Sequence, residues 1–178
     1  MNDLLLLALL LGGPKYGYQL KREAGWMMGQ QALHNNIVYP LLRRFLEEGW
    51  VSKRAVPGQR GQTRQQYALT GKGRRTLIER LNQFSEAEAA SEHAFRLRLG
   101  LFPFLESGVQ ERVFGLREKY LERRDGVLAA LEQNMDLGKF GGEIVRYMRK
   151  QIQLEREWIG HLRRLARAKF AGSKENKP

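Results

Sequence analysis

The spacing of apolar residues predicts helices and one hairpin in the first half of the chain. Over residues 36–48, apolar side chains recur every three or four positions, as in an amphipathic helix. Residues 50–56 alternate between apolar and polar, and a similar short run follows at 65–69, which predicts two strands joined by a loop. The expected helices span residues 2–11, 16–28 and 36–48, and a fourth follows Thr70, its expected N-cap. Helices followed by a hairpin and a further helix are typical of a winged helix.

The first of these helices lacks a polar face. Residues 4–11 are apolar without interruption, and a helix that is apolar on all sides must be buried on all sides. The face that a small winged-helix domain cannot cover would contact the C-terminal helices or a second subunit. Alternatively, the helix is enclosed within its own protomer. The run is too short to cross a bilayer, which takes about 20 apolar residues, and Asp3 stands where a secretion signal would be basic. We expect a structural helix in a cytoplasmic protein with no membrane partner.

Proline at position 40 affects where the third helix begins. Inside a helix a proline costs about 3 kcal/mol, whereas in the first turn it removes only a donor that has no partner. We therefore expect the regular turns to begin at Ile37 or Val38, preceded either by Asn35 or Asn36 as the cap or by a frayed entry. Tyr39 would then lie at the exposed N-terminal end, where recognition helices contact bases.

The second half of the chain is predicted to be helical throughout. A helix over residues 86–99 precedes a break at 100–108, which contains a proline and two glycines. Two long helices follow, separated by a turn at residues 138–142, and their apolar residues recur at nearly heptad spacing. Such a pair suits antiparallel packing or dimerisation.

The expected fold class is therefore mainly α, with two domains. Residues 1–84 would form a winged helix-turn-helix domain of helices and a two-stranded β-wing. Residues 85–170 would form a C-terminal α-helical dimerisation domain, and residues 171–178 a disordered tail.

Positive charge is concentrated in the first of these domains. The chain carries 31 Lys and Arg against 19 Asp and Glu, a net charge of +12, and residues 1–84 hold 13 of the former and only 5 of the latter. Residues 50–75 contain seven Lys and Arg and no acid. This balance favours polyanions, nucleic acid first. It argues against the alternative of a winged-helix protein-interaction module with a helical assembly domain.

Signals of catalysis are weak. The chain has no cysteine, and His34, His93 and His161 are far apart in sequence. Glu157 and His161 share a helix face, but without further ligands a solvated pair is the favoured interpretation. The glycines of the hairpin loop lack the following helix and the Gly-Lys-Ser/Thr of a phosphate loop. We expect no enzymatic activity, no cofactor and no metal, and a basic helical enzyme is the least favoured class.

Two segments carry side chains suited to DNA. The start of the third helix offers residue types that read base edges in the major groove. The hairpin offers flexible donors for phosphates or the minor groove, and two residues at the start of the second helix are placed to contact the backbone. The candidate DNA-binding residues are Lys15, Tyr16, Asn35, Asn36, Tyr39, Arg43, Gln59, Arg60, Gln62, Thr63 and Arg64.

Three motifs in residues 1–84 carry a family resemblance. They are Gly13-Pro14-x-x-Gly17-Tyr18-x-Leu20, Val38-Tyr39-Pro40-x-Leu42-x-x-Phe45-x-Glu47-Glu48-Gly49-Trp50-Val51 and Arg64-Gln65-x-Tyr67-x-Leu69-Thr70-x-x-Gly73. In this order they resemble the PadR family of bacterial transcriptional regulators. The remainder is similar in length and helical pattern to the larger PadR subgroup with a long helical C-terminal domain. Asn36 and Ile37 depart from the family's usual Gly-Ser, so base contacts of this turn are not carried over.

The resemblance implies a homodimeric repressor that binds a near-palindromic double-stranded operator through two recognition helices and two wings. It also implies that the first helix of one subunit packs on the other subunit, and that a small effector, often aromatic, weakens DNA binding. The residues expected at the dimer interface are Leu4, Leu7, Leu11, Ile144, Met148, Ile152, Ile159 and Leu162.

Overall fold

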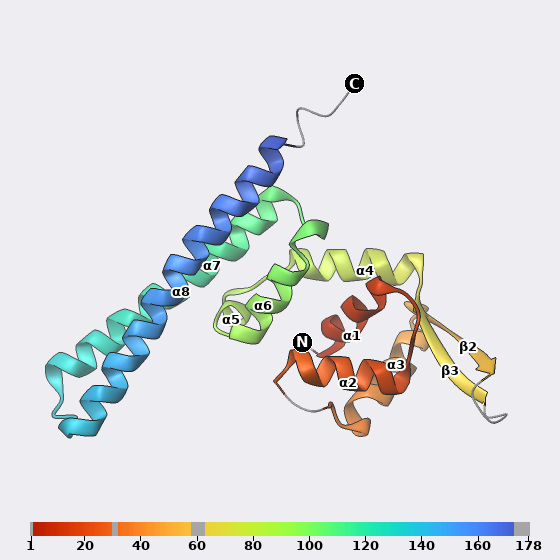
Figure 1. Cartoon of the computed structure of the whole chain (residues 1–178), viewed down its shortest axis with the longest axis horizontal. Coiled ribbons are helices and arrows are strands. Elements are labelled where there is room, and N and C mark those ends of the chain that lie inside the picture. Colours follow the sequence, from red (N-terminus) through yellow and green to blue (C-terminus); the bar gives the residue numbers. More distant parts are fainter. Residues whose placement is uncertain (1, 30–31, 58–62, 173–178) are drawn as a thin grey trace. The chain divides into compact units, whose positions relative to one another are not determined.

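The computed structural model of the chain describes residues 2–29, 32–57 and 63–172. The chain forms two compact units (Figure 1). The winged-helix unit comprises Met1–Phe84 and Arg96–Leu105, and the helical unit comprises Ser85–Phe95 and Glu106–Pro178. Among the described residues, no helix is both long enough and apolar enough to traverse a bilayer.

The winged-helix unit has the predicted order of elements, with one additional strand. Its elements are α1 (Asn2–Leu9), η1 (Leu10–Gly12), β1 (Lys15–Tyr16), α2 (Gly17–Met27), α3 (Asn35–Glu47), β2 (Val51–Pro57), β3 (Thr63–Leu69), α4 (Gly71–Asn82), the end of α6 (Glu92–Gly100) and η3 (Phe102–Phe104). The predicted fold class, mainly α with a winged helix and a helical C-terminal region, is confirmed.

The apolar helix α1 is enclosed by the unit to which it belongs. Leu4, Leu5, Leu6 and Leu7 are consecutive and all are buried, so every face of the helix is covered. The helix packs against α2, α3 and α4. This is the second of the two alternatives for this helix, in which it is enclosed within its own protomer. A role of Leu4, Leu7 and the half-buried Leu11 in dimerisation stays a prediction.

The sheet contains three antiparallel strands in the order β1-β3-β2. Lys15 and Tyr16, which we predicted as the start of a helix, instead pair with Tyr67 and Gln66 of β3, so this prediction was wrong. The Gln19 side-chain Oε1 accepts a hydrogen bond from the Tyr16 N–H at 2.9 Å, and α2 therefore begins only at Gly17. The predicted hairpin is confirmed, with Val51 opposite Leu69 and Pro57 opposite Thr63.

Helix α3 begins earlier than Pro40 suggested. His34, not an asparagine, is the N-cap, and its carbonyl accepts hydrogen bonds from the N–H groups of Ile37 and Val38. Pro40 therefore lies inside the helix, beyond its first turn. The carbonyl that loses its donor to Pro40 is that of Asn36, which is exposed. Water can satisfy this carbonyl, and the cost of the proline is smaller than in a buried helix.

The junction of the hairpin and α4 is fixed by Thr70. Its Oγ1 accepts a hydrogen bond from the Gly73 N–H at 3.0 Å, which confirms the predicted N-cap. The same hydroxyl donates to the carbonyl of Gly49 at 2.8 Å, so it joins the end of α3 to the start of α4. A Cβ at Gly73 would overlap the carbonyl oxygen of Trp50, and this close approach requires glycine.

The helical unit consists of α5 (Glu86–Ala89), the start of α6, α7 (Ser107–Asn134) and α8 (Gly138–Gly172). The single helix predicted over 86–99 is broken, because Ser91 begins a new helix and its Oγ accepts from the Ala94 N–H. The loop between the two long helices lies before Gly138. The prediction of a loop at residues 138–142 was therefore wrong, because these residues form the start of α8.

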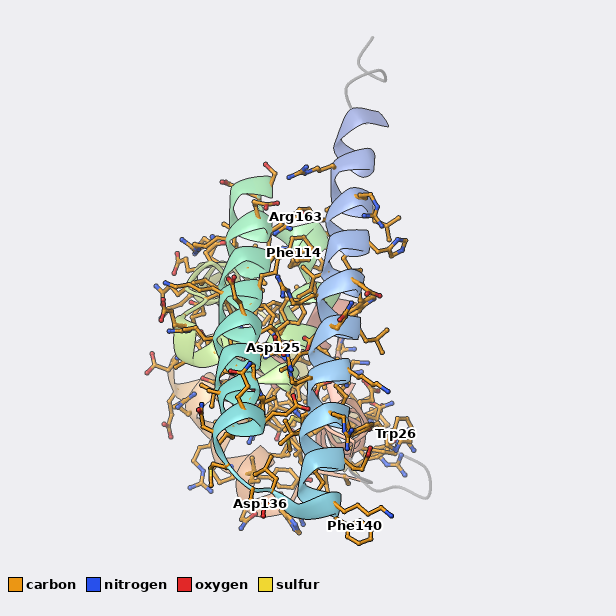
Figure 2. The ribbon with its side chains drawn as sticks, turned by 90° about the vertical axis from the view of Figure 1, so that its left-hand side faces the viewer. Trp26, Phe114, Asp125, Asp136, Phe140 and Arg163 are labelled. Atoms are coloured by element: carbon orange, nitrogen blue, oxygen red, sulfur yellow. The ribbon has the colours of Figure 1, made fainter. Side chains whose placement is uncertain are left out.

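The two long helices lie side by side and are joined by both apolar and ionic contacts (Figure 2). Phe114 and Ile159 are fully buried, and the guanidinium of Arg163 lies 5.4 Å from the centroid of the Phe114 ring. Arg163 also donates two hydrogen bonds to Glu118, at 2.9 and 2.8 Å. Further along, Arg149 contacts Asp125 at 2.9 Å, so paired charges fix how the helices face each other.

Candidate nucleic-acid interface

Helix α3 has one buried face and one polar face. Val38, Leu42 and Phe45 are buried, and they hold the helix against the rest of its unit. Asn35, Asn36, Tyr39 and Arg43 are exposed at a spacing of about four residues, as predicted, and so form one stripe along the helix. Three of the four are Asn or Arg, whose side chains are suited to base edges, and the fourth is a tyrosine.

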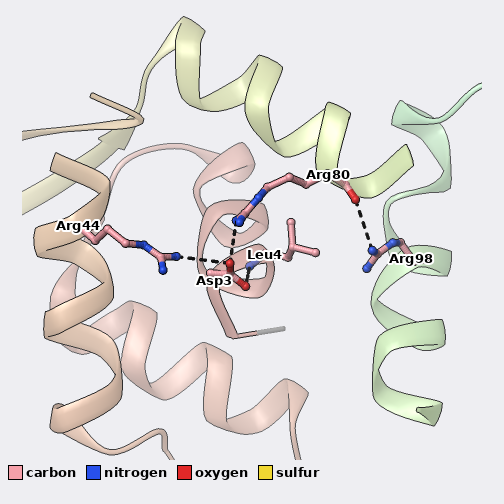
Figure 3. A network of polar contacts seen from close by, with 5 residues as sticks. All are labelled: Asp3, Leu4, Arg44, Arg80 and Arg98. Atoms are coloured by element: carbon pink, nitrogen blue, oxygen red, sulfur yellow. Dashed lines mark hydrogen bonds and ion pairs between the residues drawn. The ribbon is translucent and has the colours of Figure 1, made fainter. Parts of the chain in front are cut away.

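Asp3 of α1 anchors α3 from its inner side (Figure 3). Its Oδ2 accepts hydrogen bonds from Arg80 of α4 at 2.7 Å and from Arg44 of α3 at 3.4 Å. The guanidinium groups of Arg44 and Arg80 lie 6.0 and 5.2 Å from the centroid of the Trp50 ring. Arg44 therefore holds the helix in place, whereas its neighbour Arg43 stays on the open face.

The same cluster keeps Asp3 ionised. Burial acts to raise the pKa of Asp3, but the hydrogen bonds and positive charges around its carboxylate, those of the Leu4 N–H and Arg80 among them, lower the pKa to about 2. The carboxylate is charged at every pH at which DNA binding would be measured. Its two arginine contacts are thus independent of pH in that range.

The strands of the hairpin carry the second set of cations. Arg54 of β2 donates from Nε to the side chain of Gln66 on β3 at 3.1 Å. Lys53 is exposed and Arg64 is half-buried, and neither has an ion-pair partner in the described parts of the chain. Lys72 is already engaged, because its Nζ donates to the carbonyl of Glu48 at 2.7 Å. Arg64 and Lys53 therefore remain available to an anion, as do the outer nitrogens of Arg54, whose Nε bonds only a neutral amide.

The other predicted residues fall into two groups. Lys15 forms an ion pair with Glu23 at 2.9 Å, and the Tyr16 ring stacks on Tyr18 with centroids 5.8 Å apart. Thr63 is exposed at the start of β3. The predicted wing residues Gln59, Arg60 and Gln62 lie outside the described residues, and their contacts stay predictions.

A groove next to the polar face of α3 contains residues that the sequence did not suggest as part of a site. We call it the tyrosine groove; its volume is about 640 Å³, and it is lined by Tyr16, Gly17, Tyr18, Tyr39, Arg64, Gln65 and Tyr67. Tyr18 is 48% exposed and Tyr67 lies in the second predicted strand, and neither is among the candidate DNA-binding residues. The pairing of β1 with β3, which brings these rings together, has no signal in local periodicity.

An exposed polar helix face beside a cationic hairpin defines a winged-helix protein of the nucleic-acid-binding class. Residues 6–79 match the sequence profile of the transcriptional regulator PadR-like family. The resemblance expected from the three motifs is thereby confirmed, and the matched segment contains all of α2, α3, β2 and β3. Fold and family match together support a DNA-binding transcription regulator.

The chain is similar to solved structures of such regulators, some of which match most of it and others only a part. Bacillus subtilis PadR in complex with operator DNA is 18% identical, with 92% of this chain and 98% of that chain covered and a TM-score of 0.45. A PadR family transcriptional regulator from Eggerthella lenta is 30% identical, with 44% and 70% covered and a TM-score of 0.38. No curated protein gives a significant match.

Proposed function

We propose that this protein is a cytoplasmic, homodimeric repressor that binds double-stranded operator DNA in a sequence-specific manner. The observation that carries the proposal is the exposed stripe of α3, from Asn35 to Arg43, in a unit that matches a family of transcriptional regulators. In this proposal the stripe enters the major groove, where Asn pairs with adenine and Arg with guanine. Arg64, together with the predicted wing residue Arg60, contacts the flanking phosphates.

The proposed dimer is supported by a second apolar stripe on α8. Ile152 and Ile159, expected at the interface, are buried within the protomer, and Met148 and Leu162 are half-buried. Ile144 is 55% exposed and belongs to a stripe with alternating spacings of four and three residues. We call this stripe the α8 seam; it comprises Phe140, Ile144, Tyr147, Gln151, Leu154, Trp158, His161 and Leu165. Such a heptad pattern is the pattern of a coiled-coil interface, and a second copy of the same seam is a matching partner.

The dimer is tested by placing a charge in the seam. Leu154, which is 68% exposed, can be replaced by lysine without disturbing the monomer. We expect Leu154→Lys to elute as a monomer in size-exclusion chromatography with light scattering, and to bind DNA more weakly because two half-sites no longer act together. Gln133→Lys, on an exposed position of α7, is the matched control and should stay dimeric. A dimeric Leu154→Lys protein would contradict the assignment of the seam.

Release by a small aromatic effector is the part of the proposal that follows from the family resemblance. It predicts that one or more small phenolic or other aromatic compounds lower the affinity of the dimer for its operator. A screen that measures release of labelled operator checks this, and a repressor without such an effector would show no release by any compound.

The function itself is tested with the DNA upstream of the gene that encodes this chain. We expect the full chain to bind this duplex more tightly than random duplex, with an affinity that falls steeply as the KCl concentration rises. Salt-insensitive binding, or binding no tighter than to random DNA, would contradict the proposed regulator. Binding that is absent from both duplexes would favour the interaction-module alternative.

A further inference from the structure

The tyrosine groove lies where β3, the start of α2 and the recognition helix α3 meet. β1 pairs with β3 at only two positions, Lys15 with Tyr67 and Tyr16 with Gln66, and the chain then turns into α2. The next residues of β3, Gln65 and Arg64, therefore line the groove together with the first turn of α2. Tyr39 belongs both to the groove and to the exposed stripe of α3.

The first turn of α2 contributes backbone donors. Gly17 and Tyr18 are the first residues of an eleven-residue helix, and the N–H groups of a first turn have no partner within the helix. The helix dipole adds partial positive charge at this end. Gly17 also allows the Tyr39 ring to lie close to the helix start, since a Cβ there would be 3.0 Å from Tyr39 Cε1.

Tyr67 provides a second, independent indication of a ligand. Its side chain is only 8% exposed and lines the groove, yet its hydroxyl makes no hydrogen bond to any residue that the structure describes. The ring is packed within the protein and the hydroxyl opens into the groove, where a bound group or water takes its hydrogen bond. Burial, and to a smaller extent the neighbouring Tyr39, raise the pKa of Tyr67, so the hydroxyl keeps its proton and is available as a donor.

The groove offers hydrogen-bond donors and positive charge but no carboxylate. Its lining residues are four tyrosines, one glycine, one glutamine and one arginine. Arg64 is half-buried, and no acid within the described residues forms an ion pair with it. A phosphate group has only acceptor oxygens and a negative charge, so it complements this lining.

We propose that the tyrosine groove binds one phosphodiester of the DNA backbone, with Tyr67, the first-turn amides of α2 and Arg64 donating to its oxygens. This inference rests on the proposed function and extends it, because it assigns Tyr18 and Tyr67 to the interface and gives the DNA a fixed point next to Tyr39. Inorganic phosphate has the same chemistry, and the experiment must separate the two sources.

The test compares variants of the full chain on a duplex selected from a random-sequence pool, with fluorescence anisotropy at several KCl concentrations. Tyr67→Phe removes one hydroxyl and keeps the ring. We expect its affinity to fall by about tenfold for selected and random duplex alike, with an unchanged salt slope because no charge is lost. Arg64→Gln should lower the salt slope by about one. Tyr120→Phe and Arg124→Gln, which alter the helical unit, are the controls and should bind like wild type.

The outcomes separate the groove from the function as a whole. Wild type that binds DNA, with Tyr67→Phe and Arg64→Gln binding equally well, would overturn the phosphodiester site and leave the regulator intact. Loss of DNA binding by wild type would instead contradict the proposed function.

Potassium phosphate is also compared with KCl at equal ionic strength. If phosphate displaces DNA from wild type more effectively than chloride does, and not from Tyr67→Phe, the free ion and the DNA backbone compete for the groove, which supports the proposal. If phosphate raises the melting temperature of wild type but not of Tyr67→Phe, and displaces DNA no better than chloride does, the groove is a site for the free ion and the proposal is overturned. Melting temperatures verify that each variant is folded, and Arg64→Gln tests the site if Tyr67→Phe is unstable.

Discussion

Arginine has different partners in the two units of this molecule. In the helical unit, Arg117, Arg149 and Arg163 each form an ion pair with a carboxylate on the neighbouring long helix. In the winged-helix unit, Arg43 and Arg64 have no acidic partner among the described residues. Net charge therefore does not by itself locate a DNA interface. What indicates the interface is a group of cations without an acidic partner beside the exposed stripe of α3, since cations such as Arg124, which has no acidic partner among the described residues, also occur in the helical unit.

The largest expected effect concerns a paired arginine. Arg117 is 4% exposed, contacts Glu155 at 2.8 Å and donates to the carbonyl of Ala89 at 2.6 Å. Arg117→Met should lower the free energy of unfolding by about 3 kcal/mol, because Glu155 and a buried carbonyl lose their partner. Chemical denaturation measures this, with the exposed Arg124→Met as control. A change below about 0.5 kcal/mol would mean that the paired arginines are not structural.

The second prediction separates two adjacent arginines of α3. Arg43→Ala should weaken operator binding by about tenfold and leave stability within about 0.5 kcal/mol, because its side chain lies on the open face. Arg44→Ala should instead lower stability, because Arg44 contacts Asp3. Anisotropy titrations and thermal melts of both variants decide the matter. If Arg43→Ala and Arg44→Ala change DNA affinity and stability to the same extent, the two arginines do not have the separate roles assigned to them.

The smallest effect is the acid sensitivity of the Asp3 cluster. The pKa of Asp3 is lowered from 3.8 to about 2 in the folded state, so its stabilising contribution is present above pH 4 and is lost as the pH falls toward 2. Asp3→Asn should be less stable than wild type at pH 7 by about 1 kcal/mol, and the difference should shrink between pH 4 and pH 2. Urea denaturation across this range measures it. A constant difference would show that the charge of Asp3 does not matter.

Local patterns predicted most of the helices and the hairpin, but not the features set by tertiary contacts. The periodicity of α3 and the capping signal of Thr70 are encoded within a few residues, and both predictions are confirmed. The strand at Lys15 and Tyr16 depends on pairing with a segment some fifty residues away, and no local spacing indicates it. The start of α3 was predicted too late because a proline inside a helix was expected to cost a backbone hydrogen bond. The carbonyl that loses this bond lies on an exposed turn, where the cost is smaller.

The candidate site also has one part that local sequence patterns predict and one part that depends on tertiary contacts. The stripe of α3 could be predicted, because the buried face of an amphipathic helix determines which residues are exposed. The tyrosine groove could not, because its walls come from β1, α2, α3 and β3 and depend on the extra strand. Exposure on α8 also could not be predicted. Ile144 and Ile152 look alike in sequence, but Ile144 is exposed and Ile152 is buried.

The salt dependence of DNA binding tests the central claim most directly. The slope of the logarithm of the binding constant against the logarithm of the KCl concentration is measured for wild type, for Lys53→Gln/Arg64→Gln and for Arg124→Gln/Lys139→Gln, a control in the helical unit. If the uncompensated cations of the winged-helix unit contact phosphates, the first double variant should lower the slope by about two and the control should leave it unchanged. Equal slopes for all three proteins would contradict the assignment of the DNA interface to the winged-helix unit.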